Sequence, residues 1–184
     1  MSNAWIQSAV ALLFGTWLAL PGWAEDIEED LPLGKVPKPI MKTVKDRFPD
    51  AKPVSAVYGQ DKEGAYYEVA LLVKHAAPKP PKKGEIPPPD RHIFIVFDAA
   101  GVVHEISKEL AVKDVPEPVA KAISGKFPKS TIEMALEQAH ETPGVKQKLT
   151  FDLLVAKADK KKVHLTIDPK GKILKEEAVK EEKK

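Results

Sequence analysis

Two fourteen-residue segments carry apolar residues at every fourth position, which is the spacing of one face of a helix. The first segment reads VPKPIMKTVKDRFP at Val36–Pro49, and the second reads VPEPVAKAISGKFP at Val115–Pro128. They align without a gap, seventy-nine positions apart, and share six identical residues. Prolines open both segments, where a first helical turn tolerates them, and each segment closes with Phe-Pro, which ends a helix. The pattern predicts two equivalent helices and therefore an internal repeat.

Each predicted helix has an apolar stripe that ends in a phenylalanine. The stripes consist of Val36, Ile40, Val44 and Phe48 in the first helix and of Val115, Val119, Ile123 and Phe127 in the second. We expect Phe48 and Phe127 to be buried between their helices and a sheet, because they close the apolar stripes.

Alternating apolar and polar residues after each helix predict a meander of antiparallel strands. The expected strands are 54–58, 65–74, 91–97 and 102–106 in the first repeat and 132–136, 148–157, 163–167 and 173–174 in the second. Two Asp-x-x-Gly motifs, Asp98–Gly101 and Asp168–Gly171, lie between apolar strands. Turn chemistry explains both motifs, since aspartate accepts hydrogen bonds from its own turn and glycine supplies a positive φ.

These elements predict an α+β fold of two tandem α-β-β-β-β repeats, each a helix packed on an antiparallel sheet, preceded by a signal peptide. The expected boundaries are a signal peptide at 1–24, an acidic linker at 25–32, repeat 1 at 33–107, a linker at 108–114, repeat 2 at 115–177 and a charged tail at 178–184. A Pro-rich insertion at 75–90 extends one hairpin of repeat 1, either as a mobile tip or as a recognition segment. One repeat is too small to be very stable alone, so we expect the two to pack side by side or to form one continuous sheet.

The first twenty-four residues contain no charged side chain and all three tryptophans. The apolar run Ala9–Leu20 has the length of a signal peptide, and Gly22-Trp23-Ala24 places small residues at the −3 and −1 positions of a cleavage site. We predict export with cleavage after Ala24 and no stable membrane span after cleavage; the alternatives are an uncleaved anchor and a buried helix. Tryptophan should then be absent from the mature protein.

Composition excludes several kinds of site. The 184 residues include no cysteine, so neither disulfides nor thiolate metal ligands are available. The formal net charge is +2 and the lysines are dispersed among acidic residues, which argues against a nucleic-acid partner. The Lys/Glu run at Lys175–Lys184 predicts a solvated tail or a frayed helix.

A helix that ends in Phe48-Pro49, the strand motif Tyr67-Glu68-Val69 and the Asp-x-x-Gly turn together resemble the PepSY-like family, also called β-lactamase-inhibitor-protein-like. Two such units cover Leu33–Glu177, although the second has Phe151-Asp152-Leu153 at the strand motif. The resemblance implies exported bacterial proteins, often in tandem, whose helices pack on one face of an antiparallel sheet. It implies no catalytic motif, and its better understood relatives act by binding, including inhibitors of β-lactamases or peptidases.

No pattern in the sequence predicts an enzyme, a cofactor or a metal site. The sequence has no nucleophile motif and no glycine-rich phosphate loop, and turn chemistry already explains Asp98 and Asp168. The five histidines do not match one another under the repeat alignment. His92 and His104 could meet across neighbouring strands and bind a metal, but surface histidines are the favoured interpretation.

The sheet face opposite the predicted helices differs between the repeats. In repeat 2 it is largely polar, whereas repeat 1 places four large apolar or aromatic residues there: Tyr66, Leu72, Phe94 and Val96. Because an exposed apolar face usually marks an interface, we predict that these four residues bind a protein partner. The alternative is that the Pro-rich insertion or repeat 2 covers this face.

The sequence therefore favours an exported, periplasmic or secreted, non-enzymatic binding protein, such as an inhibitor or a chaperone-like partner of a cell-envelope protein. A periplasmic domain that senses a small ligand or a metal is the second hypothesis, and an enzyme of unrecognised type is the third.

Overall fold

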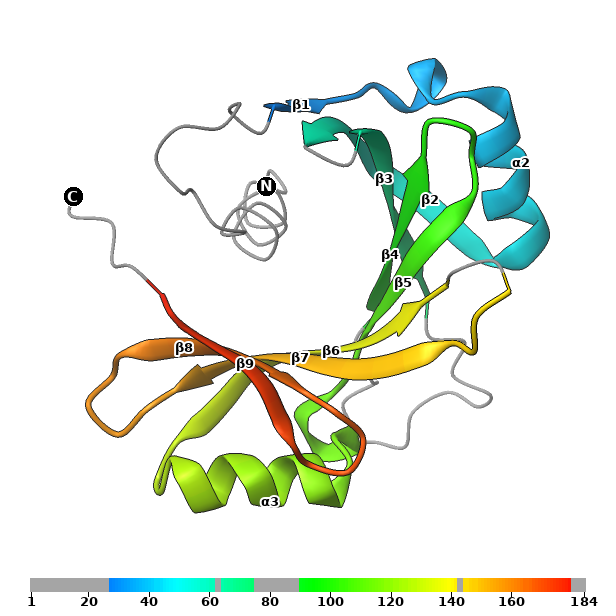
Figure 1. Cartoon of the computed structure of the whole chain (residues 1–184). Helices are drawn as coiled ribbons and strands as arrows, with labels where there is room; N and C mark the ends of the chain where they lie inside the picture. The colour runs from blue at the N-terminus through cyan, green and yellow to red at the C-terminus, as the bar shows by residue number, and fades with distance from the viewer. Residues whose placement is uncertain (1–26, 62–63, 75–89, 142–143, 180–184) are drawn as a thin grey trace, which may run out of the picture.

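The computed structural model describes residues 27–61, 64–74, 90–141 and 144–179 (Figure 1). The expected signal peptide, most of the Pro-rich insertion and the last residues of the charged tail lie outside these ranges. Within them, nine strands form a single antiparallel sheet in which each strand pairs with the next along the chain. The strands are β1 (Ile27–Asp30), β2 (Ala51–Asp61), β3 (Gly64–Val73), β4 (Arg91–Asp98), β5 (Val103–Glu109), β6 (Thr131–His140), β7 (Lys148–Ala156), β8 (Lys162–Ile167) and β9 (Ile173–Ala178).

The order of elements is the same in the two halves of the chain. A 3-10 turn η1 (Leu33–Lys35) and helix α2 (Lys38–Arg47) precede β2–β5, and η2 (Val112–Asp114) and helix α3 (Glu117–Lys126) precede β6–β9. Each helix has a proline in its first turn, as the sequence predicts. The α+β class is confirmed, and the halves share one continuous sheet because β5 pairs directly with β6.

Both helices lie on the same side of the sheet, which bends between its halves so that α2 and α3 are on the convex side (Figure 1). The opposite face is concave. Each half has its own core between helix and sheet, as the alternation predicts. The first core consists of Val36, Ile40, Val44, Ala56, Val69, Leu71, Ile93, Ile95, Phe97, Val103 and Ile106. The second consists of Val115, Val119, Ile123, Ala135, Phe151, Leu153, Val155, Val163, Leu165 and Ile167.

The apolar stripes of the helices are buried except at their last residue. Ile40 and Val119 are fully buried, and each such side chain contributes roughly 1.5–3 kcal/mol of hydrophobic free energy. Phe48 and Phe127, which the sequence predicts to be buried, are only partly so and pack against the edges of the two cores. The reason is positional: each phenylalanine follows the last helical residue and has a non-helical backbone, so it does not continue the regular helical face.

The two Asp-x-x-Gly motifs form the turns that the sequence predicts. Asp98 Oδ1 accepts hydrogen bonds from the amides of Ala100 and Val102, both at 2.9 Å. Asp168 Oδ1 accepts equivalent bonds from Lys170 and Lys172, also at 2.9 Å. These backbone bonds, led by that from Val102, lower the pKa of Asp98. Both aspartates therefore have a structural role.

At the ends of the sheet, β1 was not predicted from the sequence, and β9 extends beyond the predicted strand 173–174. Strand β1 lies within the expected acidic linker and pairs with β2. Strand β9 takes up the beginning of the Lys/Glu run, so the prediction of a solvated tail or frayed helix is wrong for Lys175–Ala178. Charged side chains on edge strands discourage pairing with other chains, which explains why two such polar segments form the edges.

Candidate functional site

The concave face is formed by the side chains that alternate with the core residues along the central strands. Across the sheet these residues are Tyr66, Glu68, Ala70 and Leu72; His92, Phe94 and Val96; Glu105, Ser107 and Glu109; Leu136, Gln138 and His140; Thr150, Asp152 and Leu154; and His164 and Thr166. The concave face is apolar and aromatic in the first half, polar where the halves join, and mostly polar in the second half.

The four residues predicted to bind a partner all lie on the concave face, but in different surroundings. Phe94 is buried, with 8% of its surface exposed, and forms a small apolar cluster with Ala70 and Leu136. Its ring also stacks on His92, with 6.1 Å between the ring centroids. Leu136 belongs to the second half of the chain, so this cluster connects the halves on the face opposite the helices.

Tyr66, Leu72 and Val96 are half-buried. The hydroxyl of Tyr66 donates a hydrogen bond to Glu28 Oε1 at 2.6 Å. Its ring lies against Gly59, where a Cβ atom would be only 2.1 Å from the ring, so this glycine is needed for close approach. Burial, followed by the hydrogen bond to Glu28, raises the pKa of Tyr66. The hydrogen bond to Glu28 and the contact with Gly59 therefore hold Tyr66 in place.

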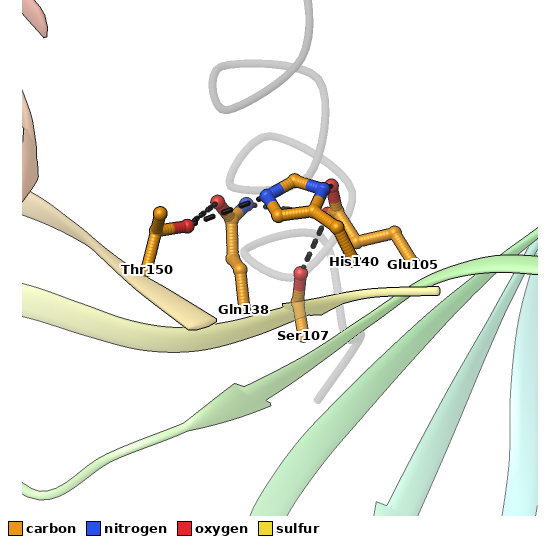
Figure 2. Close-up of polar contacts among 5 residues, drawn as sticks. All are labelled: Glu105, Ser107, Gln138, His140 and Thr150. Carbon is orange, nitrogen blue, oxygen red and sulfur yellow. Dashed lines mark hydrogen bonds and ion pairs between the residues drawn. The ribbon is translucent and has the colours of Figure 1, made fainter. Parts of the chain in front are cut away.

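Five polar residues meet where β5, β6 and β7 run side by side, and we call them the seam cluster: Glu105, Ser107, Gln138, His140 and Thr150 (Figure 2). Glu105 Oε1 accepts hydrogen bonds from Ser107 Oγ at 2.8 Å and from Gln138 Nε2 at 3.2 Å. Its other oxygen lies 3.1 Å from His140 Nδ1. The hydrogen bond to Glu105 raises the pKa of His140. Glu105 is thus the centre of the seam cluster.

The seam cluster contains a Glu–His–Thr chain that outwardly resembles a catalytic relay. His140 Nε2 lies 3.3 Å from Thr150 Oγ1, while His140 Nδ1 faces Glu105. Thr150, however, is only 1% exposed, and it lies in a central strand whose neighbours pair with it on both sides. Backbone amides in such a ladder bond to the neighbouring strands, so the described residues around Thr150 form no evident oxyanion hole. The geometry supports a fixed polar network better than acyl transfer.

Two acidic residues at the centre of the concave face lack full hydrogen bonding. Glu68 is 5% exposed, and the interactions of its carboxyl group with described residues include no hydrogen bond. Burial, with the nearby charges of Glu28 and Glu105, raises its pKa to about 8. Asp152 occupies the matching strand position in the second half, and its buried Oδ1 has no hydrogen-bond partner among the described residues. Burial also raises the pKa of Asp152, although a hydrogen bond from Thr166 opposes the effect.

Sequence reasoning overlooked Glu68, Glu105 and Asp152. A signal was present: Glu68 interrupts an otherwise apolar strand centre, and Asp152 repeats the acid at the aligned position. The residue type alone predicts exposure, and only the neighbours from adjacent strands decide that Glu68 is buried.

His92 and His104, the two candidate metal ligands, lie apart in the structure. His92 Nδ1 lies 3.0 Å from Glu109, whereas His104 Nε2 lies 3.2 Å from Asp98 at the turn, near the other end of β4. Among the residues that the structure describes, no group of three or more metal-ligating side chains could hold an ion. The same part of the chain contains no helix long and apolar enough to cross a membrane.

Solved structures share this arrangement of helices and sheet. A BLIP-like protein from Bacteroides fragilis (BLIP, β-lactamase-inhibitor protein) aligns with a TM-score of 0.55 and 18% identity, over 81% of this chain and 88% of that one. The chain has a BLIP-like fold. A DUF2874 family protein from Bacteroides uniformis gives a TM-score of 0.57 at 14% identity, over 78% and 89% of the two chains. A protein from Bacteroides eggerthii, predicted to be periplasmic, gives 0.57 at 16% identity, over 77% and 88%.

At 14–18% sequence identity, the similarity to these solved structures concerns the fold alone. No protein-family model matches the sequence, and no curated protein matches it. The function must therefore be argued from the concave face itself.

Proposed function

We propose that this protein is an exported, non-enzymatic binding protein that holds a cell-envelope protein on the concave face of its BLIP-like sheet. The observation that carries the proposal is the asymmetry of the sheet. Both helices pack on the convex side, so no described helix covers the concave face (Figure 1). That face carries Tyr66, Leu72 and Val96, whose side chains are half-buried. Aromatic side chains such as Tyr66 dominate the energetics of protein interfaces, and the aliphatic side chains beside it add apolar contact area.

The roles of the four predicted residues follow from their burial. Tyr66, Leu72 and Val96 offer contact surface, with Tyr66 already oriented by its hydrogen bond to Glu28. Phe94 has little exposed surface with which to contact a partner. Its role is to support the concave face by packing against Ala70 and Leu136. Inhibition of a target enzyme and chaperone-like protection of a partner would both use this surface.

Two further proposals concern the cellular location of the protein and its division into repeats. The apolar segment before Glu25 and the similarity in fold to a protein predicted to be periplasmic support export to the periplasm. The two gapless helix segments and the repeated order of elements support two tandem PepSY-like repeats, 33–107 and 115–177.

Site-specific crosslinking in cells tests the binding function. A photoreactive amino acid replaces Leu72 on the concave face or, as a matched control, the exposed Lys42 on α2. We expect a discrete crosslinked protein from the Leu72 position, and its loss when Tyr66 is changed to Ala. Crosslinks that form only from the Lys42 position, or from neither position, would refute the proposal. A melting temperature that rises with a divalent metal while no crosslink forms would favour a sensor.

A further inference from the structure

Glu68 is in an unusual position for a carboxylate. It lies opposite Val57 of β2 on one side and Val96 of β4 on the other, at the middle of the concave face. Only 5% of its surface is exposed, and the interactions of its carboxyl group with described residues include no hydrogen bond. A buried ionised carboxylate without a donor or a cation is expensive, so such groups are normally paired.

The charged groups nearest to Glu68 are themselves acidic. Glu28 on β1 and Glu105 on β5 both act on it electrostatically, and both oppose its ionisation. In the sheet register Glu68, Val96 and Glu105 occupy one row, so the two acids are two strand spacings apart, roughly 10 Å. The neighbouring strands β2 and β4 contribute only apolar side chains to this row.

Asp152, at the matching position in the second half, has neighbours that stabilise its charge. Asp152 receives a hydrogen bond from Thr166, and His140 and His164 favour its charged form. Nothing equivalent among the described residues surrounds Glu68, although the two residues occupy the same place in their half of the chain. The first half therefore has an acidic group whose positive partner is missing from the described residues.

We propose that Glu68, together with Glu105, receives a lysine or arginine side chain of the protein partner on the concave face. The inference rests on the proposed function and adds the chemistry of the contact. A long basic side chain fits because its aliphatic stem can lie on Val57 and Val96 while its charged head reaches the two carboxylates. Arginine fits best, since its planar guanidinium can bond to two acceptors. A lone metal ion fits poorly, because the described residues offer no group of three or more ligating side chains that could hold one.

Peptide selection tests the inference and does not require the partner to be identified. A random heptapeptide library displayed on phage is selected against the full chain, against Glu68→Gln and against the control Glu137→Gln. Glu137 lies on the same sheet but faces the helix side, because it pairs with the core residue Phe151. We expect lysine and arginine to be enriched at least fivefold at one peptide position with the wild type and with Glu137→Gln. With Glu68→Gln their frequency should fall to that of the unselected library.

Synthetic peptides give a second readout that needs no mutation of the protein. One selected peptide is compared with a copy in which citrulline, the neutral isostere, replaces the arginine. The wild type should bind the arginine peptide at least tenfold more tightly, and this preference should grow from pH 6.5 to pH 8.5 as Glu68 ionises beside Glu28 and Glu105. Circular dichroism confirms that each variant is folded.

The outcomes separate this inference from the binding function. Peptides that bind the wild type without basic enrichment, or enrichment that persists in Glu68→Gln, would overturn the cation site and leave the binding face intact. A selection that yields no peptide whose binding is abolished by Leu72→Glu would overturn both proposals.

Discussion

Replacing Glu68 with glutamine should make the protein more stable at alkaline pH and leave its stability almost unchanged at pH 4.5. Glutamine has nearly the shape of a protonated glutamate but cannot ionise. The substitution therefore removes only the penalty of placing a negative charge among Val57, Val96 and the acidic neighbours Glu28 and Glu105.

The magnitude follows from the change in pKa. Folding raises the pKa of Glu68 from an ordinary 4.5 to about 8, so between these pH values the folded state binds more protons than the unfolded state. Stability then falls as pH rises, by up to about 1.4 kcal/mol per pH unit and by about 5 kcal/mol in all. The stabilisation that results from the raised pKa of Glu68 is fully present below pH 4.5 and is lost as pH rises through about 8. A typical domain has only 5–15 kcal/mol of stability, so the effect is large.

Urea unfolding followed by circular dichroism, at pH values from 4.5 to 8.5, measures the effect. His140 and Asp152 also have raised pKa values and give slopes of the same sign, but both remain in the variant. The difference between wild type and Glu68→Gln therefore isolates Glu68, and Glu137→Gln controls for loss of a carboxylate. Parallel stability curves for wild type and Glu68→Gln would refute the reasoning, because they would show that Glu68 ionises in the folded protein without penalty.

Two further predictions concern stability. Gly101 and Gly171 have φ of 85° and 86°, but a Cβ at Gly171 would lie 2.5 Å from the carbonyl oxygen of Pro118, whereas nothing lies within 3.4 Å of one at Gly101. In urea melts we expect Gly101→Ala to cost about 1–2 kcal/mol and Gly171→Ala about 2–5; equal losses would contradict the contact. Arg47 bonds Glu141 through two N–H groups, at 2.7 and 2.8 Å. A double-mutant cycle should give a coupling of about 0.5–1 kcal/mol that 1 M NaCl reduces, and no coupling at low salt would show that the pair contributes nothing.

The sequence by itself determined the features that depend on local periodicity. Four-residue spacing specified which face of each helix is buried, and two-residue alternation assigned Val69 and Phe94 to opposite faces of the sheet. The Asp-x-x-Gly turns were predictable because each aspartate accepts hydrogen bonds from backbone amides of its own turn. Each of these features is decided by residues within a few positions of one another, so distant contacts have no part in it.

Only the tertiary structure decided what lies next to each side chain on the concave face. Glu105 and His140 come from different halves and meet because β5 pairs with β6. Phe94 is buried because Leu136, from the second half, packs against it. Alternation put Glu68 on the right face, but its burial depends on β2 and β4, which flank it. The environment of a charged group is set by neighbours that are distant in the chain, and its pKa and its need for a partner are set with it.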